Sequence, residues 1–429
     1  MAYPAPVYLV DGARTPFLKA RGGPGPFAAA DLAVQAGRAL LLRQPFLPAH
    51  LDEVILGCAA PSPDETNIGR LVALRLGCGP RVPGWTVMRN CASGLQAIDS
   101  AAANIVAGRA DLVLAGGVDA LSRAPLLYGD TMVRWFAALQ GLKSPTARLA
   151  HFLKLRPAAL FAPVVGLLKG LTDPMVGLLM GQTAENLAAR FAISRQAMDD
   201  YALRSHQRAL AGRAAGHFAE IVPLVDAAGR IYGEDDGVRE DASAAGMARP
   251  GPFFDRPHGR ITAANSSQVS DGAAWLLLAS QAAVERWKLD PLGRLVDVRW
   301  AGLEPDSMGF GPVCAATPLL IDNDLTLAEV DAWEINEAFA AQVLACLAAW
   351  CSEPWCREEL GLERAFGAPD EQVLNVDGGA IALGHPVGAS GARIVLHLLH
   401  VLRRRGGRRG VATLCIGGGM GGAALVETL

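Results

Sequence analysis

The sequence predicts an α/β protein built from two similar halves. Strand-like apolar runs alternate with helix-like segments along the chain, and one helix-to-strand pattern occurs twice. Hydrophobic residues make up 51% of the chain, and 48 of its 429 residues are glycine, a composition that suits close packing of helices on sheets. The alternation predicts mainly parallel sheets. A chain of this length exceeds one ordinary hydrophobic core, so we expect two or three domains.

The predicted strands are short apolar runs that end at glycine or polar residues. Two alanine-rich segments with helical spacing, at residues 93–110 and 194–212, predict helices. The strands are expected in "VYLVDG" (7–12), "DEVILGCAA" (52–60), "GWTVMR" (84–89), "DLVLAGG" (111–117), "GRLVDVRWAG" (293–302), "VDAWEIN" (330–336) and "GVATLCIGGG" (410–419).

The internal repeat joins a small-residue turn, a helix and a strand that ends in glycines. It reads "CASGLQAIDSAAANIVAGRADLVLAGG" at residues 91–117 and "GASGARIVLHLLHVLRRRGGRRGVATLCIGGG" at residues 388–419. A duplicated unit places the two helix starts, near Ser93 and Ser390, on related sites of two similar domains. We therefore expect both helix N-termini to face one pocket.

The middle of the chain differs from the rest in amino-acid composition. Residues 124–260 contain much arginine, proline and glycine and are predicted to form an inserted loop domain. The expected division is therefore residues 1–123 plus 261–292 for an N-terminal domain, 124–260 for the loop domain and 293–429 for a C-terminal domain. The segment "CSEPWCREELGLERAFGAPDEQ" (351–372) is expected to be a second, smaller surface insertion, whose two cysteines lack the paired ligands of a zinc site.

Composition and the start of the chain restrict the function classes. The net charge of −3 gives no overall field for nucleic acid. The eight cysteines lack a short repeated spacing, which indicates a reducing compartment, and "MAYPAPVYLVDGARTPF" lacks the pattern of a signal peptide, so we expect a cytoplasmic protein. Lys169, Asp173 and three prolines interrupt the apolar stretch 157–180. That stretch is not expected to span a membrane, whereas attachment to a surface stays open.

The pentapeptide "NCASG" (90–94) places Cys91 between a predicted strand and a predicted helix. Free backbone N–H groups and the dipole at a helix N-terminus favour a thiolate. An isolated cysteine is more often a small core residue, so this position alone leaves both interpretations open.

Five motifs in order give the chain a resemblance to a known family. They are "NCASGLQAI" (90–98), "MGQTAEN" (180–186), "NEAFA" (336–340), "GGAIALGHPVGASGAR" (378–393) and "CIGGGMG" (415–421). Together they resemble the thiolases over nearly the whole chain. The resemblance implies two duplicated βαβαβαββ domains in a layered αβαβα arrangement with an inserted loop domain. It also implies an acyl-CoA C-acyltransferase that cleaves 3-ketoacyl-CoA with CoA, or runs the reverse condensation, without a metal or redox cofactor.

The chemistry of acyl transfer explains which residue types these motifs supply. A cysteine thiolate holds an acyl group and then releases it, which fits Cys91, and a histidine can move the thiol proton, which fits His385. By resemblance, Cys415 moves a proton at the α-carbon of the second acyl-CoA. Two oxyanions need stabilisation. The resemblance assigns the enolate to His385 and a water held by Asn336, and the tetrahedral intermediate to the backbone N–H groups of Cys91 and Gly417. For Asn336 a helix cap is the alternative.

The resemblance also suggests which residues meet coenzyme A. Ser267 lies near the pantetheine, Arg239 near the adenine or the phosphates, and Met180 and Phe339 complete the set. Short-chain thiolases have a motif similar to "HMGTTAEN", whereas the matching segment of this chain is "LLMGQTAEN". By this resemblance, Leu179 replaces a histidine at the acyl or pantetheine site.

Subfamily and assembly stay open at this point. The long apolar insertion at 132–176 favours degradative thiolases, and "FFDRPHGRITAANSS" (253–267) resembles the β-subunit of the fatty-acid oxidation complex, a type that commonly has histidine where Asn336 stands. The alternatives are a short-chain biosynthetic acetoacetyl-CoA thiolase, a decarboxylating ketosynthase, which would not need Cys415, and a non-catalytic CoA-binding subunit. A homodimer or homotetramer is expected, and a hydratase/dehydrogenase partner is a further possibility.

Overall fold

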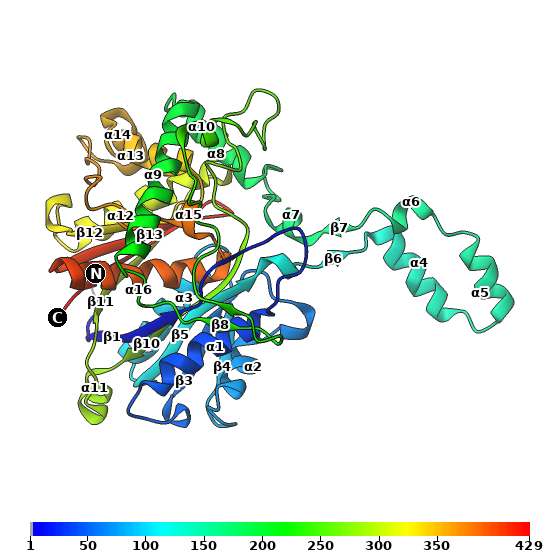
Figure 1. Cartoon of the computed structure of the whole chain (residues 1–429), viewed down its shortest axis with the longest axis horizontal. Coiled ribbons are helices and arrows are strands. Elements are labelled where there is room, and N and C mark those ends of the chain that lie inside the picture. Colours follow the sequence, from blue (N-terminus) through cyan, green and yellow to red (C-terminus); the bar gives the residue numbers. More distant parts are fainter. Residues whose placement is uncertain (1–2) are drawn as a thin grey trace.

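The computed structural model describes residues 3–429 and has one ten-stranded sheet at its centre (Figure 1). The order of its strands is β12-β13-β14-β11-β1-β10-β5-β3-β4, and β2 pairs with β10 off this path. The strands are β1 (Val7–Arg14), β2 (Leu18–Lys19), β3 (Glu53–Gly57), β4 (Gly84–Val87), β5 (Leu112–Ala120), β10 (Ser270–Ala279), β11 (Gly293–Gly302), β12 (Ala332–Ile335), β13 (Arg409–Ile416) and β14 (Met420–Glu427).

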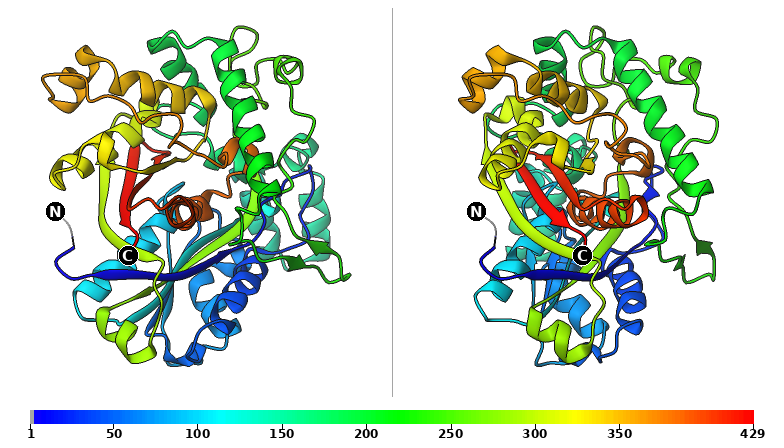
Figure 2. Two further views of the ribbon diagram at one scale, coloured as in Figure 1. Left: turned by 60° about the vertical axis from the view of Figure 1, so that its left-hand side comes forward. Right: turned by 90° about the vertical axis from the view of Figure 1, so that its left-hand side faces the viewer.

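Helices cover the sheet in layers. The helices outside residues 126–170 are α1 (Ala29–Leu42), α2 (Ile68–Arg75), α3 (Ser93–Val106), α8 (Met180–Arg190), α9 (Arg195–Ala214), α10 (Ala244–Ala248), α11 (Gln281–Trp287), α12 (Gly311–Asp322), α13 (Ala340–Trp350), α14 (Glu353–Leu360), α15 (Ala380–Leu383) and α16 (Val387–Arg405). Helices α1 and α2 pack on one half of the sheet, and α12 packs on the other. Between the two halves lie α3 and α16, which contact each other (Figure 2). The arrangement is the predicted αβαβα layering.

The two halves repeat one topology. In the first half β3, β5, β10 and β1 are neighbours in that order, and in the second half β12, β13, β14 and β11 are. The repeated sequence forms α3 with β5 in one half and α16 with β13 in the other. The predicted duplication is therefore confirmed. β1 and β11 join the halves through a short antiparallel contact, in which Val7 pairs with Leu295.

The expectation of mainly parallel sheets is wrong. The parallel pairs of the large sheet are β3–β4, β3–β5 and β12–β13, and its other pairs are antiparallel. The reason lies in β10 and β14, two strands that the predicted set did not include. Each of them lies between two strands that run the opposite way. Residues of β5 and β10 are buried throughout, because helices cover both faces of the sheet there.

The two central helices touch where each begins. A Cβ atom added to Gly94 of α3 would lie 2.7 Å from the carbonyl oxygen of Gly388 in α16, and one added to Gly117 of β5 would lie 1.9 Å from the same oxygen. Only residues without a side chain allow this approach, which explains the small residues in both copies of the repeat. The contact brings both helix starts to one place, as predicted from the duplication.

Residues 126–165 form an arm that extends away from the rest of the molecule (Figure 1). Its stem is a two-stranded ladder, in which Leu126 pairs with Val165. Its elements are β6 (Leu126–Leu127), α4 (Asp130–Gly141), α5 (Pro145–Phe152), α6 (Pro157–Leu160) and β7 (Val164–Val165), and α7 (Gly166–Gly170) follows directly. A second ladder beyond the large sheet joins β8 (Leu224–Val225) to β9 (Ile231–Tyr232). No helix of residues 3–429 combines the length and apolar character needed to cross a membrane.

A buried network of charges joins the loop region to both halves. His397 of α16 places Nδ1 3.0 Å from Glu220 and Nε2 3.2 Å from Asp377. Glu220 also contacts Arg14 of β1, and Asp377 also contacts Arg404. Burial lowers the pKa of His397, but the two carboxylates more than offset this effect and raise it to about 9.

We expect His397→Gln to destabilise the protein in a pH-dependent way. The folded pKa of His397 lies above the usual value of 6.5, so its stabilisation is complete below pH 6.5 and is lost as the pH rises through 9. The difference between the folded pKa and the usual value of 6.5 corresponds to about 3 kcal/mol of stability. The free energies of unfolding in urea of the native and the variant protein should therefore differ most near pH 6 and become equal near pH 10. A difference that stays constant over this range would contradict the assigned charge on His397.

Candidate active site

Three of the predicted catalytic residues line one cavity of about 240 Å³. Cys91, His385 and Cys415 face it from three separate segments of the chain. Cys91 precedes α3, His385 precedes α16 and Cys415 lies near the end of β13. The rest of the wall is mostly apolar: Leu121, Leu167, Leu168, Leu171, Leu179, Met180, Phe253, Phe254, Val269, Met308, Ala338, Phe339 and Val387, with Ser266, Ser267 and Gln268.

A tight turn presents Cys91 between β4 and α3. Asn90 has a positive φ of 45°, a conformation that asparagine tolerates better than most residues. Its side chain donates to the carbonyl oxygen of Gly417 at 2.7 Å, which ties the turn to the end of β13. The Ser93 hydroxyl donates to the carbonyl oxygen of Asn90 and accepts from the backbone N–H of Arg89. The position of the Cys91 sulfur is therefore fixed by both halves of the molecule.

The resting thiol differs from the predicted thiolate. Burial raises the pKa of Cys91, and Asp119 raises it further, although the backbone N–H groups of Gly417 and of Cys91 itself lower it. The local effect expected at the helix N-terminus is thus outweighed by removal of the sulfur from water. Cys91 therefore needs a base to become a nucleophile. The same two N–H groups are those predicted to stabilise the tetrahedral intermediate, and both act on the sulfur.

His385 lines the same cavity as Cys91. Its Nδ1 lies 2.6 Å from the Ser390 hydroxyl, which itself donates to the carbonyl oxygen of Pro386. Because the hydroxyl proton is used there, Ser390 accepts from Nδ1–H, and Nε2 keeps its lone pair. Nε2 lies 3.5 Å from the side-chain nitrogen of Asn336. Burial, assisted by Arg393, lowers the pKa of His385 to about 4, so the ring is neutral near pH 7.

We expect Ser390→Ala to lower kcat while leaving the KM for CoA nearly unchanged. The variant leaves a buried Nδ1–H without its acceptor and removes the bond that holds the imidazole tautomer. Loss of such a bond costs about 1–3 kcal/mol, which corresponds to roughly tenfold to a hundredfold in kcat. Steady-state kinetics and the thermal midpoint of the same preparation check it. An unchanged kcat, or a loss that follows unfolding, would contradict the positioning role.

Asn336 does not cap a helix. It follows β12 directly, whereas the residue that caps α13 is Phe339. Asn336 is fully buried, its backbone N–H donates to Thr413 on β13, and its Oδ1 has no partner among residues 3–429. Beside it, Glu337 accepts from Tyr201 and from Ser205 of α9. The helix-cap alternative for Asn336 is therefore wrong, and its side-chain amide faces His385.

Cys415 and Gly417 lie at the turn from β13 to β14. Burial raises the pKa of Cys415 well above its usual value, and the nearby Cys91 raises it further. A cysteine with this environment is a thiol at rest. The turn continues through Gly418 and Gly419, whose φ values of 93° and 76° favour glycine. Gly417 and Gly418 line a second cavity of about 580 Å³ that also contains Cys91.

The predicted coenzyme A residues divide into two groups. Ser267, Met180 and Phe339 line the cavity with Cys91, and so does Leu179. Arg239 lies in neither cavity that contains Cys91. Its backbone N–H donates to His206. Three of the four predicted coenzyme A residues therefore line the same cavity as Cys91.

Asp119 is a site residue that the sequence reasoning missed. It is fully buried at the end of β5 and accepts from the backbone N–H groups of Ala59, Ala60 and Gly388. Burial raises its pKa to about 6 despite these bonds. Asp119 thus ties the start of α16, next to His385, to the loop after β3. An acidic residue at the end of an otherwise apolar strand, in "LVLAGGVDA", was the available signal.

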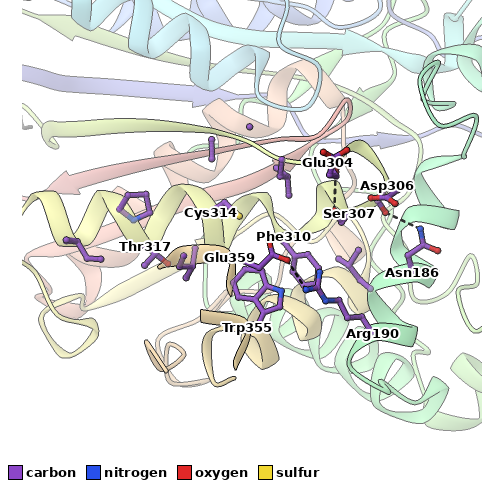
Figure 3. Close-up of a pocket in the computed structure, with 17 residues that line it drawn as sticks. Asn186, Arg190, Glu304, Asp306, Ser307, Phe310, Cys314, Thr317, Trp355 and Glu359 are labelled. Atoms are coloured by element: carbon purple, nitrogen blue, oxygen red, sulfur yellow. Dashed lines mark hydrogen bonds and ion pairs between the residues drawn. The ribbon is translucent and has the colours of Figure 1, made fainter. Parts of the chain in front are cut away.

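A larger cavity lies elsewhere, beside α14. It measures about 1240 Å³ and lies between α8, α12 and α14, as Figure 3 shows. Glu359 of α14 forms an ion pair with Arg190 of α8 at 2.8 Å, and Trp355 is buried. The predicted surface insertion therefore packs partly into the core. None of the predicted site residues lines this cavity, so it is not the site of the chemistry considered above.

Comparisons with known proteins agree over the whole chain. The thiolase N-terminal domain model matches residues 7–282, and the thiolase C-terminal domain model matches residues 289–428. A beta-ketoadipyl-CoA thiolase of Pseudomonas aeruginosa is 40% identical, covering 98% of each chain. A 3-ketoacyl-CoA thiolase of Yersinia enterocolitica is 37% identical, covering 98% of this chain and 96% of the relative. The crystal structure of human mitochondrial 3-ketoacyl-CoA thiolase in complex with CoA is similar with a TM-score of 0.85 and 35% identity, covering 100% and 99% of the two chains. The chain belongs to the thiolase family.

Proposed function

We propose that this acyltransferase cleaves 3-ketoacyl-CoA with CoA, or condenses two acyl-CoA molecules in reverse, through an acyl group held on Cys91. The observation that carries the proposal is the common cavity of Cys91, His385 and Cys415. The thiolase family and the names of the relatives support the reaction class. Thiolases act on coenzyme A thioesters without a metal or redox cofactor.

In the first half-reaction His385 Nε2 takes the proton of Cys91, and the sulfur attacks the 3-keto carbon. The bond between C2 and C3 then breaks, and its electron pair forms the enolate of acetyl-CoA. The protonated His385 and a water held by Asn336 stabilise the enolate oxygen, and Cys415 donates a proton to C2. Acetyl-CoA leaves, and the shortened acyl group stays on Cys91.

In the second half-reaction the Cys415 thiolate left by the first step takes the thiol proton of CoA, and the CoA sulfur attacks the acyl carbon. The backbone N–H groups of Cys91 and Gly417 stabilise the resulting oxyanion, since both act on the Cys91 sulfur. The Cys91 thiolate is then the leaving group. The enzyme returns to its resting form when the protonated His385 gives its proton back to Cys91.

The proposed substrates have medium or long acyl chains. Leu167 of α7 and Leu171, which follows the end of α7, line both cavities that contain Cys91. Leu179 stands where short-chain thiolases have a histidine. The apolar wall offers more contact than an acetyl group can use. A short-chain biosynthetic acetoacetyl-CoA thiolase is the alternative, for which the polar contact at position 179 is missing.

We expect kcat/KM for CoA-dependent cleavage to rise along a series of 3-ketoacyl-CoA substrates from C4 toward longer chains. Each CH₂ group buried in the cavity contributes about 0.8 kcal/mol until diffusion limits the rate. Loss of the 3-ketoacyl thioester, followed spectroscopically, measures it, with Leu167→Ser as a variant that should flatten the rise. A series that peaks at C4 and falls steeply would return the protein to the short-chain class, and no cleavage at any length would overturn the proposed reaction.

The proposal extends to organisation and location. The division into residues 1–123 plus 261–292, 124–260 and 293–429 is supported by strands β1, β3, β4, β5 and β10 in the first part and β11–β14 in the last. Assembly of identical chains is supported by β4, which is an edge strand of the sheet and is followed by the exposed Met88. A cytoplasmic location is supported by the eight cysteines, all of which are free thiols.

A further inference from the structure

The arm of residues 126–165 has its own small core. Trp135 of α4 stacks on His151 of α5 with ring centroids 4.9 Å apart, and it also contacts Phe136 and Phe152. The indole N–H of Trp135 donates to the carbonyl oxygen of His151, and Nε2 of His151 lies 3.0 Å from the carbonyl oxygen of Trp135. Helices α4 and α5 are therefore held together as a unit at the end of the β6–β7 stem (Figure 1).

The arm is basic in an otherwise acidic chain. Residues 131–172 contain no Asp or Glu, although the chain has 42 of them, and Asp130 is the one acidic residue of the arm. With five cations against that one acid, the arm carries +4, whereas the whole chain carries −3, so the remainder carries −7. The five cations are all exposed, and they are Arg134, Lys143, Arg148, Lys154 and Arg156.

Large apolar side chains lie exposed among these cations. Leu153 is 84% exposed and Phe161 is 80% exposed, and both flank Lys154 and Arg156 in sequence. Leu149 and Phe152 of α5 are at least half exposed as well. Isolated exposed leucines are ordinary, but these four side chains lie within residues 149–161 of one protruding element (Figure 1). Cations together with protruding apolar side chains are the combination that binds a lipid surface.

We propose that the arm docks on the surface of a bilayer that contains anionic phospholipid. The cations meet the phosphate groups, and Leu149, Leu153 and Phe161 enter the boundary between headgroups and acyl chains. The arm lies on the bilayer and does not cross it, because α4 has 12 residues and α5 has 8, where a span needs about 20. Contact between the arms of two copies is disfavoured, since it would bring together two surfaces of +4.

The arm is also joined directly to a wall of the catalytic cavity. Helix α7 follows the arm directly, and its Leu167 lines the cavity that contains Cys91. The docking proposal itself does not depend on the roles assigned to the catalytic residues. The assay of binding and the assay of turnover can therefore fail independently of each other.

Flotation of the full chain with lipid vesicles tests the proposal. The protein should float with vesicles of phosphatidylcholine mixed with phosphatidylglycerol, and it should not float with phosphatidylcholine alone or at high salt. The combined variant Lys143→Gln, Lys154→Gln and Arg156→Gln should weaken binding at least about tenfold. Leu153→Ser with Phe161→Ser should weaken it as well, since the apolar side chains supply the second part of the contact.

A matched control changes the same charge on the body. Arg81, Arg109 and Arg364 are exposed and outside every ion pair of residues 3–429, and their replacement by Gln should leave flotation unchanged. Turnover of the C4 substrate should be equal in all variants, which shows that each is folded. Absence of flotation, or equal flotation of the arm and body variants, would overturn the proposal. A change of oligomeric mass in the arm variant without any vesicle binding would overturn it in favour of a contact between copies.

Discussion

Cys91→Ser is expected to leave the protein folded and to lower turnover by about a thousandfold or more. A serine hydroxyl is a far weaker nucleophile than a thiolate, and His385 is a neutral imidazole too weak to ionise it. Peptide mass spectrometry after incubation with acetyl-CoA or acetoacetyl-CoA should find the acyl group on Cys91 of the native protein. The variant should carry none, and the loss corresponds to about 4 kcal/mol or more in the barrier.

The exposed Cys351 provides a control for this experiment. It is a free thiol outside both cavities that contain Cys91, so Cys351→Ser should retain full turnover and the same acylated peptide. An acyl group found only on Cys415 would reverse the roles assigned to the two cysteines. Retention of most of the turnover by the Cys91 variant would end the proposal of covalent transfer.

Cys415→Ser should separate the two half-reactions. Transfer of an acetyl group from acetyl-CoA to Cys91 needs no proton at the α-carbon, whereas cleavage of acetoacetyl-CoA does. The variant should therefore still acylate Cys91 from acetyl-CoA. Its rates of α-proton exchange with deuterated water and of C–C bond cleavage should fall about a thousandfold. The activation barrier of these steps should rise by several kcal/mol.

Cys346 supplies a buried control close to Cys415. Both cysteines are buried, and Cys346 raises the pKa of Cys415, but Cys346 lines neither cavity that contains Cys91. Cys346→Ser should affect both half-reactions little and equally. An equal loss of acylation and of α-proton exchange in the Cys415 variant would count against its role as the acid and base at carbon. His385→Ala should damage both half-reactions.

Much of the site was predictable because its residues are carried by short motifs with distinctive glycine and proline contexts. Cys91, His385 and Cys415 follow from three such motifs, and the internal repeat predicted that two helix starts meet. The roles of Asp119 and Ser390 were not predictable, because each depends on which backbone groups the fold brings near. The prediction that Cys91 is a thiolate at rest was wrong for the same reason. A helix terminus can be read locally, whereas the burial that raises the pKa of Cys91 is a property of the assembled core.

The strand directions show a further limit of the sequence. β10 and β14 contain runs of small and apolar residues, "SDGAAWLLLA" and "MGGAALVE", without the alternation that marks a half-buried strand. Both were left out of the predicted set, and with them five of the six antiparallel pairings of the large sheet. Arg239 stays a prediction. The residues around it depart from the family pattern, and it lies outside the two cavities that contain Cys91.

The position of β10 also sets an order of events during synthesis. In the finished sheet β10 lies between β1 and β5, yet it follows β5 in the chain only after the whole loop region. Ala120 can find its partner Asp271 only once the ribosome has passed residue 271. Until then the nascent chain holds β1 and β5 with unpaired edges and uncovered apolar faces. Pairings this distant in sequence form slowly, and exposed strand edges aggregate, so the incomplete chain is the state that depends most on chaperones.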